Sequence, residues 1–368
     1  MRLRAYEIYH ELTLDDTGTM IKDLTFKDPF SALHLAFKGT NGGTDNVDNW
    51  MNDVITKIEI VDGSDVLLSL SLKEAQARDA YRNNIMPYTE FAEKGDGTQR
   101  DDVMLNFGRY LWDPEYYLDL TKFQNPQLKI TTDEDAVRAT GATGFLAASF
   151  TVSIVAHVIE EGAVSPSKGF FMAKEIYSFT ASTGEERIDL PKNYPYAAMM
   201  IHNPAHYADM DVNISQIKIS CDNDKFVPLD QYTKYLEHEN RCRYGPFQAR
   251  GIWYRKGHEN AHFPLHYNPT LAAVIAGTSG HIFNVDYIWS GRARLGIFDN
   301  AGAYTTTDEE IWVEAFGGAP HCCVWIPFGL LNVPASYFDT PSFGDIDLIL
   351  TQAAAGTIKV VLDQLRSD

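Results

Sequence analysis

The residues best suited to chemistry lie in His258-Glu259-Asn260-Ala261-His262, which has the H-E-x-x-H spacing of zinc metalloproteases. On a helix this spacing places both imidazoles on one face to bind zinc, and the glutamate acts as general base. Here Gly257 precedes the motif and Pro264 closely follows it, so a long helix is disfavoured. His266 does not stand at the distance of a third ligand. We therefore expect a polar loop rather than a zinc site.

A second reactive grouping is His321-Cys322-Cys323, whose residue types suit a nucleophile or a soft metal. The flanking residues, Ala319-Pro320 and Val324-Trp325-Ile326, indicate the entry to a buried strand, where cysteine packs as a small apolar residue. With Cys221 and Cys242 the chain has four cysteines, too few for a disulfide framework in this length. We expect all four to be reduced and buried.

No other pattern points to catalysis. Among the fifty acidic residues no pair stands out as a glycosidase acid and base, and the sequence has no phosphate loop, G-x-G-x-x-G or G-x-S-x-G motif. We predict that the chain is not an enzyme, with no catalytic, cofactor-binding or metal-ligating residues and no cofactor. The net charge of −19 opposes contact with phosphates, so we expect no direct sequence-specific nucleic acid binding.

The N-terminal residues MRLRAYEIYHEL lack the apolar region of a secretory signal. The longest apolar run, 144–159, is too short to span a membrane, and its polar and apolar residues alternate. This alternation predicts a strand with one buried face.

The secondary structure of the chain can be predicted from a stretch that occurs twice, at 55–81 and at 214–244. Each copy has alternating apolar residues, a tight turn rich in Asp, Gly or Asn, a short second strand and an amphipathic helix. Other segments also recur in the same order. These pairs are Glu7-Ile8-Tyr9 with Glu175-Ile176-Tyr177, 29–35 with 195–201, 110–114 with 324–327, 125–130 with 340–346, and the closing strands 145–159 with 357–362. The repeats indicate an internal duplication.

Short strands bounded by Gly, Pro, Asn and Asp dominate both halves, and helices are expected only at 72–83 and 230–240, with a turn at 133–138. This pattern predicts an all-β protein of two tandem eight-stranded jelly rolls, a double jelly roll, each with a short inserted helix. We place an N-terminal jelly roll at 1–164 and a C-terminal one at 165–368, the latter with a larger loop excursion at about 245–320. The division falls in the linker 160–169.

Strand–turn–strand–helix units in two tandem all-β halves resemble the double jelly-roll major capsid proteins of tailless icosahedral viruses, and the size favours a prokaryotic virus with an internal membrane. The resemblance implies a structural virion subunit that forms homotrimeric, pseudo-hexagonal capsomers and assembles in the host cytoplasm. The implied partners are neighbouring capsomers, penton and minor capsid proteins, and an internal membrane surface that Arg2 and Arg4 would meet.

Two other functions stay open at this point. A tandem jelly-roll carbohydrate-binding module or glycoside hydrolase would need exposed aromatic residues, for which Trp253, Trp289 and Trp312 are the candidates. A metal-dependent enzyme would need His258 as a ligand.

Overall fold

The computed structural model describes residues 1–43, 46, 49–90, 95–134, 144–204, 210–245, 247–255, 260–264, 267–277, 282–289, 292–298 and 309–367, and within 248–317 it describes the backbone alone.

The first barrel consists of two antiparallel sheets, with strand orders β1-β9-β3-β7-β6 and β2-β8-β4-β5. Its strands are β1 (Arg2–Thr13), β2 (Thr17–Asp23), β3 (Phe30–Thr40), β4 (Ile55–Asp62), β5 (Asp65–Leu70), β6 (Thr89–Glu90), β7 (Thr98–Asn106), β8 (Pro126–Asp133) and β9 (Thr151–Glu161). Alternate residues point inward, as in β9, where Val152, Ile154, Ala156 and Val158 are buried.

The second barrel repeats the strand order of the first, except for the two-residue edge strand β6. Its sheets have the orders β10-β23-β12-β21 and β11-β22-β13-β14. The strands are β10 (Phe170–Ala181), β11 (Gly184–Asp189), β12 (Tyr196–His202), β13 (Ile214–Cys221), β14 (Phe226–Tyr232), β21 (Cys323–Pro327), β22 (Ile346–Gln352) and β23 (Gly356–Arg366). The prediction of two eight-stranded jelly rolls is confirmed. The division predicted at 164/165 stays a prediction, and it falls between the end of β9 and the start of β10.

A short helix follows the fifth strand of each barrel. These helices are α2 (Leu72–Asn83) and α4 (Thr233–Tyr244), and a shorter helix, α1 (Met51–Val54) or α3 (Met210–Asn213), precedes the fourth strand of each barrel. The predicted bounds of α2 are confirmed, and a capping box between Ser71 and Glu74 fixes its start. The second helix begins three residues later than predicted because β14 continues to Tyr232. Most of the turn predicted at 133–138 lies outside the described residues.

The repeated Glu-Ile-Tyr triplets mark the same irregularity in both barrels. The register of β1 against β9 shifts between Glu7 and Tyr9, and the register of β10 against β23 shifts between Glu175 and Tyr177. A bulge adds one residue to a strand and bends it. The repeated triplet in the sequence therefore marks a β-bulge that occurs at the same position in both barrels.

Two predictions need correction. Segments 110–114 and 324–327 are not counterparts. The backbone amides of Phe107 and Phe328 donate equivalent hydrogen bonds, to Ser31 of β3 and Ala197 of β12, so Phe328 corresponds to Phe107. Segment 324–327 therefore corresponds to residues before Phe107, and not to 110–114. The run 144–159 forms a strand only from Thr151 onward. Before it, the Ser149 amide donates to the Leu146 carbonyl in a turn, and Ala148 takes a left-handed backbone conformation, which ends strand geometry.

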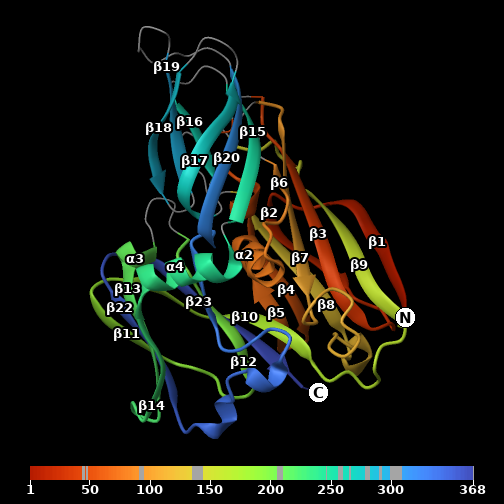
Figure 1. The fold of residues 1–368 in the computed structure, drawn as a ribbon. Helices are drawn as coiled ribbons and strands as arrows, with labels where there is room; N and C mark the ends of the chain where they lie inside the picture. Colours follow the sequence, from red (N-terminus) through yellow and green to blue (C-terminus); the bar gives the residue numbers. More distant parts are fainter. Residues whose placement is uncertain are drawn as a thin grey trace.

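A tower of strands rises from the second barrel, at the end of the molecule away from both termini (Figure 1). Its strands form two three-stranded sheets, β15-β20-β17 and β16-β19-β18. They are β15 (Phe247–Arg255), β16 (Asn260–Pro264), β17 (Tyr267–Gly277), β18 (Ile282–Trp289), β19 (Arg292–Phe298) and β20 (Glu309–Pro320). They occupy the segment where the excursion is predicted.

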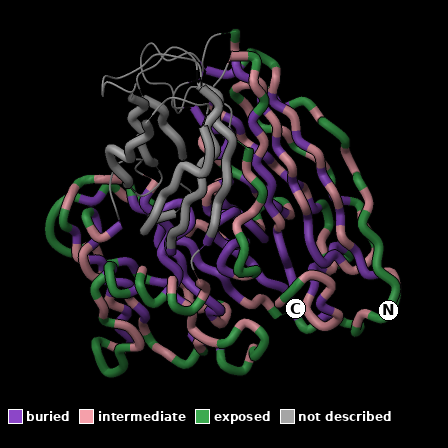
Figure 2. The backbone as a smooth tube through the Cα atoms, turned by 45° about the horizontal axis from the view of Figure 1, so that its top comes forward, coloured by how far each residue is buried: buried purple, intermediate pink, exposed green. Residues whose placement is uncertain are grey.

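The two barrels lie side by side and share a sheet. A parallel pair, β5 with β10, joins β2-β8-β4-β5 to β10-β23-β12-β21 in one eight-stranded sheet. Buried residues run through the centre of both barrels (Figure 2). The core of the first barrel continues across the junction to Phe170, Met200 and Trp325, whereas the interior of the second barrel forms a cluster of its own.

Candidate functional site at the interface of the two barrels

Helix α2 lies between the barrels and is buried on nearly all sides (Figure 1). Ala75, Ala77 and Ala80 leave room for close packing, and Leu72 fits into the core of the first barrel. Several of its polar residues, by contrast, reach the second barrel. A helix with charged side chains on a fully buried surface requires partners for each of them.

Arg78 and Arg82 share one carboxylate of the second barrel, that of Asp363 in β23. The Nε and Nη2 atoms of Arg78 lie 3.0 and 3.1 Å from the two carboxylate oxygens, and Arg82 Nη1 lies 3.0 Å from Oδ2. All three side chains are 2% exposed. The guanidinium of Arg82 also lies 4.3 Å from the ring centre of Phe171. Such a bidentate pair fixes both distance and orientation between the barrels.

Glu74 makes a second ionic contact across the interface. Its Oε1 atom lies 2.9 Å from His202 Nδ1 in β12 and 3.9 Å from Lys359 Nζ in β23. Burial on its own would raise the pKa of Glu74, but the hydrogen bond and charge of His202, with the charge of Lys359, lower that pKa to about 2. The carboxylate is therefore charged at neutral pH although it is fully buried.

Gln76 connects His321 to Asp101. Its side-chain oxygen lies 2.8 Å from His321 Nε2, and its amide donates to Asp101 Oδ1 at 3.3 Å. Burial raises the pKa of Asp101 to about 7 against the opposing effect of this hydrogen bond. Asp101 thus holds a proton more readily than an ordinary carboxyl group.

The grouping His321-Cys322-Cys323 belongs to this interface and packs as a structural element. The Tyr81 hydroxyl donates to the Cys323 carbonyl at 2.7 Å, and the Tyr81 ring stacks on Trp325 with centroids 5.3 Å apart. Burial raises the pKa of the Cys323 thiol well above its ordinary value, and a protonated thiol is a poor nucleophile. None of the four cysteines forms a disulfide, and Cys221, Cys322 and Cys323 are buried, but Cys242 is exposed on α4, so the expectation that all four are buried is wrong for Cys242.

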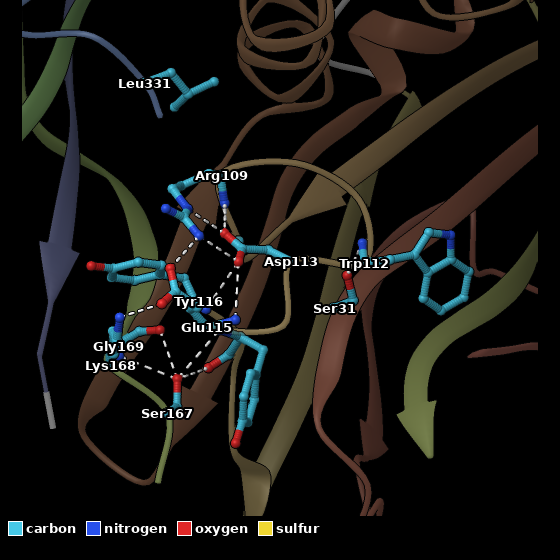
Figure 3. A network of polar contacts seen from close by, with 12 residues as sticks. Ser31, Arg109, Trp112, Asp113, Glu115, Tyr116, Ser167, Lys168, Gly169 and Leu331 are labelled. Atoms are coloured by element: carbon cyan, nitrogen blue, oxygen red, sulfur yellow. Dashed lines mark hydrogen bonds and ion pairs between the residues drawn. The ribbon is translucent and has the colours of Figure 1, made fainter. Parts of the chain in front are cut away.

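A polar network ties the loop after β7 to the linker between the barrels (Figure 3). Asp113 accepts from Arg109 Nε at 2.7 Å and from the Glu115 amide at 3.0 Å, and Arg109 also donates to Glu115 at 2.7 Å. Lys168 of the linker pairs with Glu115, and the Ser167 hydroxyl donates to the Tyr117 carbonyl at 3.0 Å. The linker is therefore held against the first barrel along its length.

The N-terminal arginines form ion pairs with their own barrel. Arg2 Nε lies 2.7 Å from Glu160, and Arg4 lies 3.2 Å from Glu160 and 3.3 Å from Asp28. Residues from Arg2 onward belong to β1, paired with β9. Contact of these arginines with a membrane stays a prediction.

The H-E-x-x-H motif is only partly described. His258 and Glu259 lie outside the described residues, whereas His262 belongs to the strand β16, so the expected loop is wrong at this position. Trp253, Trp289 and Trp312 lie in β15, β18 and β20, and their side chains also lie outside the described part. Among the residues described, no three His, Cys, Asp or Glu side chains gather as a metal site would require.

The described helices include none with the length and apolar character to cross a membrane.

Sequence reasoning missed the interface on α2. The sequence predicts an amphipathic helix with one solvated face, whereas nine of its twelve residues are buried. Small residues at Ala75, Ala77 and Ala80 are the signal that more than one face is covered.

Comparisons with known proteins identify the fold. No protein-family model and no curated protein matches this sequence. Solved structures do match over nearly the whole chain. The major capsid protein of Sulfolobus Turreted Icosahedral Virus is 10% identical, with 99% of this chain and 97% of that chain covered and a TM-score of 0.57. The major capsid protein P2 of bacteriophage PM2 is 9% identical, with 100% and 98% covered and a TM-score of 0.55. VP54 of PBCV-1 is 11% identical, with 99% and 93% covered and a TM-score of 0.56. The chain thus has the double jelly-roll fold of viral major capsid proteins.

Proposed function

We propose that this chain is the major capsid protein of an icosahedral virus and acts as a structural subunit rather than an enzyme. The observation that carries the proposal is the pair of jelly rolls whose eight shared strands have the same order, held side by side by the β5–β10 pair and α2. Two rigidly joined, equivalent barrels form a building block for a near-sixfold lattice. Similarity to three capsid structures over at least 99% of the chain supports this function and does not favour the carbohydrate alternative.

The proposed functional unit is a homotrimer with six barrels and a hexagonal outline. Its further partners are neighbouring capsomers, penton and minor capsid proteins and an internal membrane surface, in a virion assembled in the host cytoplasm. The acidic net charge of −19 supports a shell that does not itself wrap the genome.

The test is the mass and shape of the purified protein, by light scattering and negative-stain microscopy. We expect a particle of three chains of 41.3 kDa each with a hexagonal outline. A protein that stays monomeric at every accessible concentration would contradict the proposal.

A further inference from the structure

A lysine and an aspartate form an enclosed ion pair where α1 meets α2. Lys73, the second residue of α2, donates a hydrogen bond from Nζ to Oδ1 of Asp53 in α1. Each side chain is only 12% exposed, whereas Lys38 and Glu11, which form another such pair, are 41% and 45% exposed. Among the described hydrogen-bonded pairs of lysine with a carboxylate, Lys73 and Asp53 are the least exposed. Water therefore hydrates and screens this pair less than the others.

Enclosure changes the balance between the charged and the neutral form of such a pair. Removal from water disfavours an ammonium and a carboxylate, while their mutual attraction favours both. Passing one proton from Nζ to the carboxylate converts the pair into an amine and a carboxylic acid, which carry no charge and need less hydration. In this form the lone pair of Nζ lies next to a carbonyl carbon, Cγ of Asp53. The amine and the carboxylic acid are the two reactants of an amide bond.

A third group, Asp101 of β7, lies close to the pair. α1 packs against both β7 and α2. Gln76, one turn after Lys73 on α2, donates from its side-chain amide to Oδ1 of Asp101 at 3.3 Å. Asp101 is fully buried, and its other oxygen, Oδ2, makes no hydrogen bond to a residue that the structure describes. Because Oδ1 accepts the hydrogen bond from Gln76, a proton held by Asp101 resides on Oδ2.

Asp101 is suited to exchange that proton at neutral pH. Burial, and to a smaller extent the nearby charges of Asp102 and Asp53, raise the pKa of Asp101 to about 7. A group whose pKa lies near the ambient pH both gives and accepts a proton readily, as general acid–base assistance requires. An amine, a carboxyl group and a proton-exchanging carboxyl group therefore meet in one desolvated place in the first barrel.

We propose that Lys73 and Asp53 are joined in the folded chain by an intramolecular isopeptide bond, and that Asp101 exchanges the protons of this reaction. Nζ of Lys73, as the neutral amine, attacks Cγ of the protonated Asp53 carboxyl group, and a C–N bond forms. Asp101 gives its proton to the departing hydroxyl group and takes one from Nζ, so the C–O bond breaks and one water molecule leaves. One ammonium and one carboxylate thus become one amide and one water, and Asp101 regains its starting state. The reaction needs no oxidant and no further reactant.

The bond fixes the start of the helix that joins the two barrels. Lys73 and Asp53 are 20 residues apart in the chain, and β4 and β5 lie between them. A covalent link closes this segment into a loop and restricts the unfolded chain. It stands beside the capping box of Ser71 and Glu74, with which α2 begins. The reaction occurs once, on the chain itself, so the inference goes beyond the proposed function and does not depend on it.

The intact mass of the full chain tests the bond directly. We expect the wild-type protein to be lighter than its sequence mass by one water molecule, about 18 Da, in denaturing mass spectrometry. Trypsin cleaves after Lys57 and Arg78 but not after an amidated Lys73, so peptides 39–57 and 58–78 should be recovered as one linked species. Lys73→Arg should restore the full mass and leave the two segments unlinked. The matched control Lys38→Arg, at the exposed pair, should keep the loss of mass.

Two variants of Asp101 test its role, with circular dichroism to verify that each is folded. Asp101→Asn keeps the shape of the side chain but cannot exchange the proton, so this variant should keep its full mass. Asp101→Glu should recover at least part of the water loss. A folded wild-type protein of full sequence mass, or a water loss that persists in Lys73→Arg, would overturn the isopeptide bond. An Asp101→Asn variant that forms the bond as fully as the wild type would overturn the role of Asp101. Neither result alters the capsid proposal, which rests on the fold and is tested by assembly.

Discussion

Replacing Asp363 with asparagine tests the buried ion cluster that joins the two barrels. The aspartate accepts three hydrogen bonds, from Arg78 and Arg82, and all three side chains are 2% exposed. Asparagine keeps the shape of the side chain but leaves two buried guanidinium groups without a counter-ion. Removing one partner of a buried ion pair costs about 3–5 kcal/mol, so we expect the free energy of unfolding to fall by that amount.

The assay is guanidinium chloride unfolding followed by tryptophan fluorescence, with Asp347→Asn as the matched control. Asp347 pairs with Arg187 at 2.8 Å, but Arg187 is 55% exposed, and such a surface pair contributes less than about 1 kcal/mol. Equal losses in the two variants, or a loss under about 1 kcal/mol for Asp363→Asn, would refute the role assigned to the cluster.

Three further predictions concern the same interface and the adjacent loop. Because the folded pKa of Asp101 is raised to about 7 from 3.8, its contribution to stability is full below pH 4 and is lost as the pH rises through 7. Asp101→Asn should therefore stabilise the fold at pH 8 by up to about 4 kcal/mol relative to its effect at pH 4, measured by denaturant unfolding at both values. The folded pKa of Glu74 is lowered to about 2 from 4.5, so its contribution is present above pH 4.5 and lost as the pH falls through 2. Glu74→Gln should cost about 3 kcal/mol at pH 7, and a cost that stays constant down to pH 2 in urea titrations would contradict this assignment. Gly108→Ala should lower the melting temperature in calorimetry, because a Cβ atom there would lie 2.5 Å from the Tyr116 carbonyl oxygen; an unchanged melting temperature would show that the loop can yield.

Much of the fold could be predicted because it depends on interactions between residues that are close together in the sequence. The first repeated unit, from Ile55 through α2, was predictable because strand alternation and the start of a capped helix are local properties. The Glu-Ile-Tyr triplets recur because the same bulge is needed at the same place in both barrels. The match between 110–114 and 324–327 failed because it relied on a shared tryptophan, whereas Trp112 lies in a loop and Trp325 in β21.

The interface could not be predicted because its contacts join residues far apart in the chain. Arg78 and Asp363 are 285 residues apart, and neither is unusual in its local sequence. A lone arginine on a helix predicts a solvated side chain, and only the packing of the two barrels makes it a buried one.

The shared eight-stranded sheet has a consequence for the geometry of a closed shell. Backbone pairing of β5 with β10 and the buried cluster beside it oppose bending between the barrels. Any curvature that a shell of these subunits needs must then be generated where separate chains meet. Under the proposed function, the diameter of the particle would be set by the angles between capsomers and by the proteins that hold those angles, and not by bending of the subunit itself.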